Sequence, residues 1–187
     1  MHIKKYEELK EKYGHVASWA IWTNNSDANT SDLTALEDNL KKLHVRTIFV
    51  ALNISGTESD YPKTFCNFHG GKRDFMLRDA IKNTALEGSY ITDILKFFPE
   101  TDSTKVKRYF KENSNELNAH IEYFLQEMKD VGANENTLLI ALGDAAFEIL
   151  QQAQIEFTIA KITHYSAPIS KIDYRNEVLS IINNYKI

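Results

Sequence analysis

The chain has 187 residues, 43% of them hydrophobic, and a formal net charge of -4. This composition excludes disordered and fibrous classes and suits a single globular domain over residues 1–187. The acidic balance also counts against a protein that coats nucleic acid non-specifically, because such binding depends on phosphate neutralisation by Lys and Arg.

Cysteine content and hydropathy limit the cofactors and the compartment. Cys66 is the single cysteine, which excludes an internal disulfide and an iron–sulfur cluster and cannot by itself hold zinc. Residues 1–14 are charged rather than apolar, and no apolar run approaches the roughly 20 residues of a membrane helix. We therefore expect a cytoplasmic protein that has no membrane segment and needs no metal or cofactor.

Apolar periodicity predicts helices and strands that alternate along the chain. The first half is expected to contain a helix over 3–13, a strand or ordered extension over 16–22, a helix over 32–43 capped by Asp32, and a strand over 47–52. A long loop over 53–71 then leads into a helix over 72–86 and a strand over 89–95. The remainder is expected to contain a helical stretch over 103–129 with a break near 113–115, strands over 137–142 and 157–162, and helices over 144–150 and 171–185.

This alternation indicates the fold class. Strands that alternate with helices form parallel β-α-β units with right-handed crossovers, and continuous apolar strands are typical of a sheet covered on both faces. We therefore predict an α/β fold, a three-layer α/β/α sandwich around a central, mainly parallel four-stranded sheet.

Two short segments follow predicted core strands on opposite sides of the chain. They are Ala51-Leu-Asn-Ile-Ser-Gly56 and His164-Tyr-Ser-Ala-Pro-Ile-Ser170. Ligands of open parallel sheets bind at the carboxyl ends of the strands, so these loops are expected to converge on one pocket.

Both segments resemble the signature motifs of the uracil-DNA glycosylase superfamily. The family's first motif reads Gly-x-Asn-Pro-Gly or Gly-Gln-Asp-Pro-Tyr-His, and here Asn53 matches within a degenerate copy. The second reads His-Pro-Ser-Pro-Leu-Ser, which the second segment matches if Ala167 is one inserted residue. The Asn at the first position is closest to the mismatch-specific, Asn-type branch of the superfamily.

The resemblance implies roles for the residues of these motifs. Asn53 would position the water that attacks the sugar carbon, with Leu52 beside it in the substrate-binding loop. His164 would hydrogen-bond the base oxygen as negative charge develops there. Ser166 would contact a phosphate, and Ile169 would wedge into the base stack that a flipped nucleotide leaves.

Two further segments are similar to family elements that recognise the base. Phe65-Cys-Asn-Phe-His69 lies where the family places a stacking aromatic, so either Phe65 or Phe68 would stack on the base. Asp93 occupies the place of the base-reading residue, where Asn or Lys is more usual. An ionised Asp accepts but does not donate, so we expect Asp93 to pair with an exocyclic amino group rather than with uracil O4.

Structural roles would also account for these residues. Asn53 would serve as a turn residue, His164 as a satisfied core or surface histidine, and Asp93 as a cap or a partner of Lys96. Phe65 and Phe68 would then plug the end of the sheet. The basic residues Lys105, Lys107 and Arg108 fit a solvated helix face, whereas Lys72 and Arg73 are candidates for contacts with DNA.

Three functions are compatible with these observations. The first is a monofunctional DNA glycosylase-like protein, expected to be a monomer, whose partner is DNA carrying a damaged or deaminated base. The second is a member of the same fold that has lost the chemistry and serves as a nucleic-acid or protein-binding module. The third is a generic doubly wound sheet with an unrelated small-molecule site. A structure that places Asn53 and His164 far apart, with no shared cleft, would contradict both glycosylase-type interpretations.

Overall fold

The computed structural model describes residues 1–23, 27, 29–54, 60–71, 73–98 and 100–187. Its helices are α1 (Ile3–Tyr13), α2 (Thr34–Asp38), the 3-10 helix η1 (Leu40–Lys42), α3 (Asp74–Ile81), α4 (Ser103–Glu112), α5 (Ser114–Val131), α6 (Asp144–Gln152) and α7 (Lys171–Tyr185). Its strands are β1 (Ala17–Trp19), β2 (His44–Asn53), β3 (Ser89–Leu95), β4 (Leu138–Leu142) and β5 (Thr158–Ile162).

The strands form one sheet in the order β1-β3-β2-β4-β5. Strands β3, β2, β4 and β5 are parallel, as predicted, but β1 adds a fifth strand that runs antiparallel to β3. The prediction of four strands was therefore wrong. Strand β1 lies within the segment 16–22, for which a strand or an ordered extension was expected, and it has only three residues, all buried.

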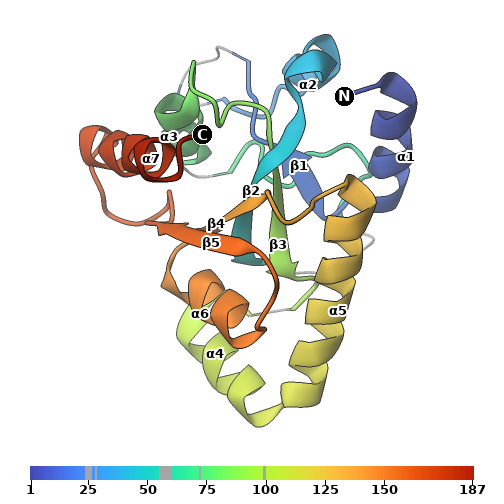
Figure 1. Cartoon of the computed structure of the whole chain (residues 1–187), viewed down its shortest axis with the longest axis vertical. Helices are drawn as coiled ribbons and strands as arrows, with labels where there is room; N and C mark the ends of the chain where they lie inside the picture. Colours follow the sequence, from blue (N-terminus) through green and yellow to red (C-terminus); the bar gives the residue numbers. More distant parts are fainter. Residues whose placement is uncertain (24–26, 28, 55–59, 72, 99) are drawn as a thin grey trace.

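Helices cover both faces of this sheet, which gives the expected layers (Figure 1). Ile48 and Val50 of β2 point into a core shared with α1, α4, α5 and α6. Phe49 and Ala51, the alternate residues, point into a second core shared with α3 and α7. A strand with apolar residues on both faces is stable only between two such layers.

The helices predicted over 3–13 and 171–185 are confirmed, but two other segments are shorter or more divided than the periodicity predicted. The segment 32–43 splits into α2 and η1, and the Asp32 carboxylate accepts a hydrogen bond from the Thr34 backbone N–H at 2.9 Å. Helix α3 ends at Ile81 instead of 86. The break expected near 113–115 is confirmed, because Asn113 separates α4 from α5.

The segment before β2 completes the first core. Trp19 is fully buried against Tyr90 of β3, and α1 buries three of its side chains under the same layer. Tyr13 donates a hydrogen bond to Asp130, which fastens the end of α1 to α5. None of the described helices has the length and apolar character required to cross a membrane.

Candidate functional site

A cleft of about 980 Å³ opens at the carboxyl ends of β2, β3, β4 and β5. The chain passes from β2 to β3 on one side and later to β4 on the other, so the cleft lies where the strand order reverses. Six of the candidate residues line it: Leu52, Asn53, Phe68, Asp93, His164 and Ser166. Asn53 and His164 thus share one cleft although 111 positions separate them in the sequence.

The other two candidates, Phe65 and Ile169, do not line the cleft. Phe65 is fully buried in the first core, where its ring contacts Tyr6 and Trp19. Of the two aromatic candidates, Phe68 is therefore the one that faces the cleft. Ile169 packs against the second core, and its backbone carbonyl accepts a hydrogen bond from the Arg73 guanidinium at 3.0 Å.

Asn53 is the last residue of β2, and its side chain forms hydrogen bonds to the segment that follows β3. Its Nδ2 donates to the backbone carbonyls of Phe98 at 3.1 Å and Glu100 at 2.7 Å. These two carbonyls occupy both amide hydrogens, so Oδ1 is the polar atom of Asn53 that is left for a ligand. Ser55 and Gly56, which complete the first motif, lie outside the described residues.

His164 is held in one tautomer by the residue two positions later. The backbone N–H of Ser166 donates to His164 Nδ1 at 3.2 Å, and the Ser166 hydroxyl lies 2.7 Å from the same nitrogen. Because Nδ1 accepts, the proton of the neutral ring is on Nε2, which becomes a donor. Burial lowers the pKa of His164, so the ring is neutral at neutral pH.

A glycine allows the backbone to approach this histidine closely. Gly143 has a φ of 90° and joins β4 to α6. A Cβ at this position would lie 3.3 Å from the Cβ of His164. Both the left-handed backbone and the close approach therefore favour glycine beside the catalytic candidate.

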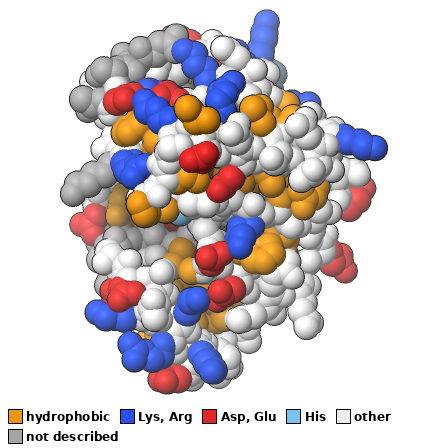
Figure 2. Space-filling view, turned by 90° about the vertical axis from the view of Figure 1, so that its left-hand side faces the viewer, with side chains coloured by type: hydrophobic (Ala, Val, Ile, Leu, Met, Phe, Trp, Pro, Cys, Tyr) orange, Lys and Arg blue, Asp and Glu red, His pale blue; other side chains and the backbone are white. Residues whose placement is uncertain are grey.

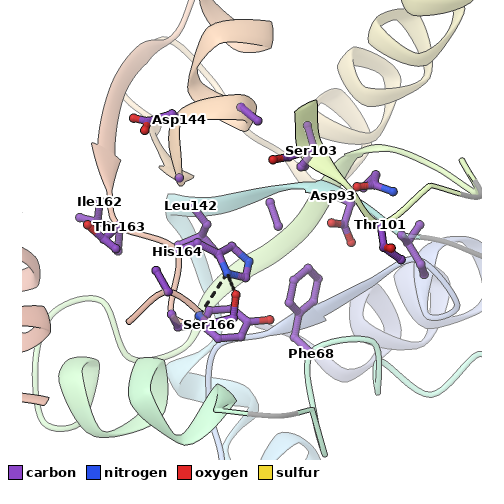
Figure 3. Close-up of a pocket in the computed structure, with 18 of the residues that line it drawn as sticks. Phe68, Asp93, Thr101, Ser103, Leu142, Asp144, Ile162, Thr163, His164 and Ser166 are labelled. Atoms are coloured by element: carbon purple, nitrogen blue, oxygen red, sulfur yellow. Dashed lines mark hydrogen bonds between the residues drawn. The ribbon is translucent and has the colours of Figure 1, made fainter. Parts of the chain in front are cut away.

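Asp93 lies in β3 with only 4% of its surface exposed. Its Oδ2 accepts a hydrogen bond from Asn67 Nδ2 at 3.0 Å. Burial raises the pKa of Asp93 from 3.8 to about 7, against the opposing effects of Lys96 and Asn67. Figure 3 shows Asp93, Phe68 and His164 pointing toward the same hollow from three segments of the chain.

A buried ion pair lies next to Asp93. The Lys96 ammonium is 2.9 Å from the Glu127 carboxylate, and it also donates to the Thr92 hydroxyl and to the backbone carbonyl of Asp93. Tyr90 and Thr92 donate to the other oxygen of Glu127. Lys96 therefore pairs with Glu127 and not with the Asp93 side chain, which differs from the structural role considered for Asp93.

Several cleft residues were missed by sequence reasoning. They are Tyr61, Asn67, Thr101, Ser103, Thr104, Lys107, Asp144, Lys161 and Tyr165. Asn67 and Tyr165 lie inside segments that the family resemblance had selected, and Lys107 belongs to the run assigned to a solvated face. Tyr165 stacks on His164 with ring centroids 4.3 Å apart, a contact that spacing cannot reveal.

Charged groups at the cleft are balanced by neighbours. Lys107 pairs with Glu148 at 2.9 Å, and Lys161 pairs with Asp144 at 2.6 Å. Acidic and basic side chains interleave on the face drawn in Figure 2. Lys72, a candidate for contacts with DNA, lies outside the described residues.

The cleft and its surroundings offer few ligands for a metal ion. Within the described parts of the chain, no three His, Cys, Asp or Glu side chains are grouped so that they could hold one. The candidate residues of the cleft supply an amide oxygen, a neutral imidazole donor, a buried carboxyl group and an aromatic face.

Comparisons with known proteins give no family. No protein-family model matches the chain, and no curated protein matches it. Function is therefore argued from the motifs and from the geometry of the cleft.

Proposed function

We propose that this chain is a DNA glycosylase-like protein of the uracil-DNA glycosylase type, which binds a flipped, damaged base and hydrolyses its N-glycosidic bond. One observation carries the proposal: Asn53, Phe68, Asp93 and His164 come from four segments and line one cleft at the carboxyl ends of the sheet. Those positions are the ones at which the family resemblance requires a water-holding amide, a stacking ring, a base reader and a donor to the leaving base.

The geometry supports a hydrolytic mechanism with little general base catalysis. Asn53 Oδ1 accepts a hydrogen bond from a water and directs its oxygen toward C1′ of the sugar, but an amide does not take the proton. The N-glycosidic bond breaks and its electron pair leaves with the base, while the water oxygen forms the new bond to C1′. The proton that the water loses passes to the departing base anion. His164 donates from Nε2 to the base oxygen on which the negative charge develops, and this donor is fixed before the reaction begins.

Stacking and burial hold the base during this step. Phe68 is 6% exposed, so its ring is held by the core while one side borders the cleft. A base that stacks on such a ring recovers part of the few kcal/mol that extrusion from DNA costs.

A cleavage assay tests the proposal. Oligonucleotides that carry uracil, hypoxanthine or xanthine are incubated with the protein, and abasic product is measured. We expect release of at least one of these bases, and we expect His164→Ala and Asn53→Ala each to reduce it by about 100-fold or more. Asn115→Ala, an exposed position on α5, is the control and should cleave like the native protein. Absence of product from every lesion contradicts the enzymatic proposal.

A second candidate is a member of this fold that binds nucleic acid without cleaving it. It is favoured by Asn53, whose amide nitrogen is occupied by the carbonyls of Phe98 and Glu100 and thus has a structural task. Binding of a lesion oligonucleotide that Phe68→Ala weakens, without release of base by the native protein, would support this candidate over the first.

A further inference from the structure

Asp93 has a side chain whose two oxygens lie in different surroundings. Oδ2 accepts a hydrogen bond from Asn67, while the residue as a whole lines the cleft. In Figure 3 the carboxyl group is directed into the hollow that Phe68 and His164 also border. Oδ1 is therefore the oxygen that is available to a bound molecule.

The orientation of Asn67 fixes which atom it offers to Asp93. Its Nδ2 lies 3.2 Å from the backbone carbonyl of Val16 and 3.0 Å from Asp93 Oδ2. A carbonyl oxygen can only accept, so the atom between these two oxygens is the amide nitrogen. Oδ2 of Asp93 is thus held as an acceptor, and a proton on the carboxyl group belongs on Oδ1.

The charged and titratable groups around Asp93 leave its charge poorly compensated. Lys96 is engaged by Glu127, and Glu127 itself opposes a second negative charge nearby. Tyr165 and the neutral ring of His164 face the cleft from the loop after β5 and carry no positive charge. A buried carboxylate in such surroundings is costly, and burial accordingly raises the pKa of Asp93 to about 7.

We propose, resting on the proposed function, that Asp93 acts as a neutral carboxylic acid and donates from Oδ1 to a carbonyl oxygen on the edge of the bound base. The cleft then selects oxo bases such as uracil, which has O4 where cytosine has an amino group. This reverses the expectation that Asp93 pairs with an exocyclic amino group, because that expectation took the carboxyl group to be ionised. Ionisation of Asp93 removes the donor and with it the preference.

The test compares two single-stranded oligonucleotides that differ only in one central dU or dC. Their Kd values are measured for the native protein from about pH 6 to about pH 8.5, a range in which the carboxyl group of Asp93 titrates. We expect dU to bind about tenfold more tightly than dC at the acid end. The ratio of the Kd for dC to the Kd for dU should fall to one or below as the pH rises through about 7, because an ionised Asp93 accepts from the amino group of cytosine.

Two variants separate Asp93 from other titrating groups. Asp93→Asn places an amide donor where the acid proton was and still accepts from Asn67, so its preference for dU should not change with pH. Asp144→Asn removes an exposed carboxylate from the same cleft and should keep the pH dependence of the native protein. His164 is present in both variants, so its titration cannot account for a difference between them.

The outcomes distinguish this inference from the function on which it rests. A preference for dC at the acid end, a ratio that stays constant in the native protein, or an Asp93 carboxyl resonance that titrates near its ordinary pKa by NMR overturns the inference alone. Binding that neither Phe68→Ala nor His164→Ala weakens means that the base does not enter the cleft. That result contradicts the proposed function and the inference with it.

Discussion

At the scale of single residues, hydrogen bonds to neighbouring groups determine which polar atom of each cleft side chain can bind a ligand. The amide nitrogen of Asn53 donates to two backbone carbonyls, and Nδ1 of His164 accepts a hydrogen bond from a backbone N–H. Asn67 likewise donates a hydrogen bond to one carboxyl oxygen of Asp93. Each side chain therefore presents one defined atom to a ligand, an acceptor from Asn53 and donors from His164 and neutral Asp93.

Burial of Asp93 should also make the unfolding free energy of the protein depend on pH, even when no ligand is bound. Its pKa is about 7 in the folded protein and 3.8 without burial, so its contribution is fully present below about pH 4 and is lost as the pH rises through about 7. Asp93→Asn has no charge to bury. We expect the variant to gain about 2–4 kcal/mol relative to the native protein between pH 4 and pH 8.5, measured by urea unfolding.

Comparing the Asp93→Asn variant with the native protein at the same pH removes the contributions of other buried titratable groups. Burial lowers the pKa of His69 to about 4, so His69 destabilises the fold as the pH falls below 6.5, which is the opposite trend. His69 contributes equally to both proteins and cancels in their difference. A difference in unfolding free energy that does not change with pH would show that Asp93 is ionised in the folded protein throughout.

At the scale of elements, α5 is joined to β3 by a buried ion pair. Lys96 follows the end of β3 and Glu127 lies in α5, and the two side chains are 6% and 0% exposed. Tyr90 and Thr92 of the same strand add two hydrogen bonds to Glu127. This polar contact fixes how α5 lies across the strand that carries Asp93.

Removal of one partner should therefore be far more damaging than removal of both. Lys96→Met leaves the Glu127 charge buried without its cation and is expected to lower the unfolding free energy by about 3–5 kcal/mol. Adding Glu127→Gln removes that charge while keeping an acceptor for Tyr90 and Thr92, so the double variant should recover most of the loss. Urea unfolding followed by circular dichroism measures both.

An exposed ion pair supplies the matched control. Lys107 and Glu148 lie 2.9 Å apart with side chains 39% and 47% exposed, and such pairs contribute about 1 kcal/mol or less. Lys107→Met should therefore cost little. Equal losses from Lys96→Met and Lys107→Met would mean that the buried pair does not hold α5 to β3.

The elements that the sequence predicted well are those with continuous apolar runs. Residues 47–52 and 137–142 are β-branched or apolar throughout, and both lie within or overlap strands buried on two faces. The place of β1 in the sheet and the split of 32–43 were not predicted because they depend on tertiary contacts: β1 pairs with β3, and Met1 donates to the carbonyl of Leu40 in η1.

The same limit applies to the site. Motif matching selected six residues that line one cleft, since they lie in or after the carboxyl-terminal halves of strands that end at the same edge of the sheet. Motif matching did not distinguish Phe68 from Phe65. Phe65 has a backbone φ of 61°, and its ring lies in the first core. Motif matching also missed that Asn67 and burial together change what Asp93 can offer, because protonation depends on surroundings that the sequence does not show.

At the scale of the whole molecule, the fold brings segments from distant parts of the chain to one edge of the sheet. Asn53 and Ile54 at the end of β2 line the same cleft as His164 after β5, together with Ser103 and Asp144 at the first turns of α4 and α6. Helices lie on both sides of the sheet that carries them (Figure 1). Net charge acts at this scale as well. With a charge of -4 and its acidic and basic side chains interleaved, the protein has little long-range attraction for DNA.

This charge distribution predicts weak salt dependence for DNA binding. Lys107 and Lys161 line the cleft, and their exposed carboxylate partners can be displaced by phosphates at small cost. Two phosphate contacts on a single strand give a slope of log K against log salt of about -1.4. Lys107→Ala and Lys161→Ala should each make that slope shallower by about 0.7.

Lys4→Ala is the control for net charge, because Lys4 is exposed on α1 and does not line the cleft. It changes the total charge as much as the two cleft variants do but should leave the slope unchanged. A much steeper slope that all three variants alter equally would mean that DNA binds across the general surface. Binding confined to the cleft requires the opposite pattern, in which position and not total charge decides the effect.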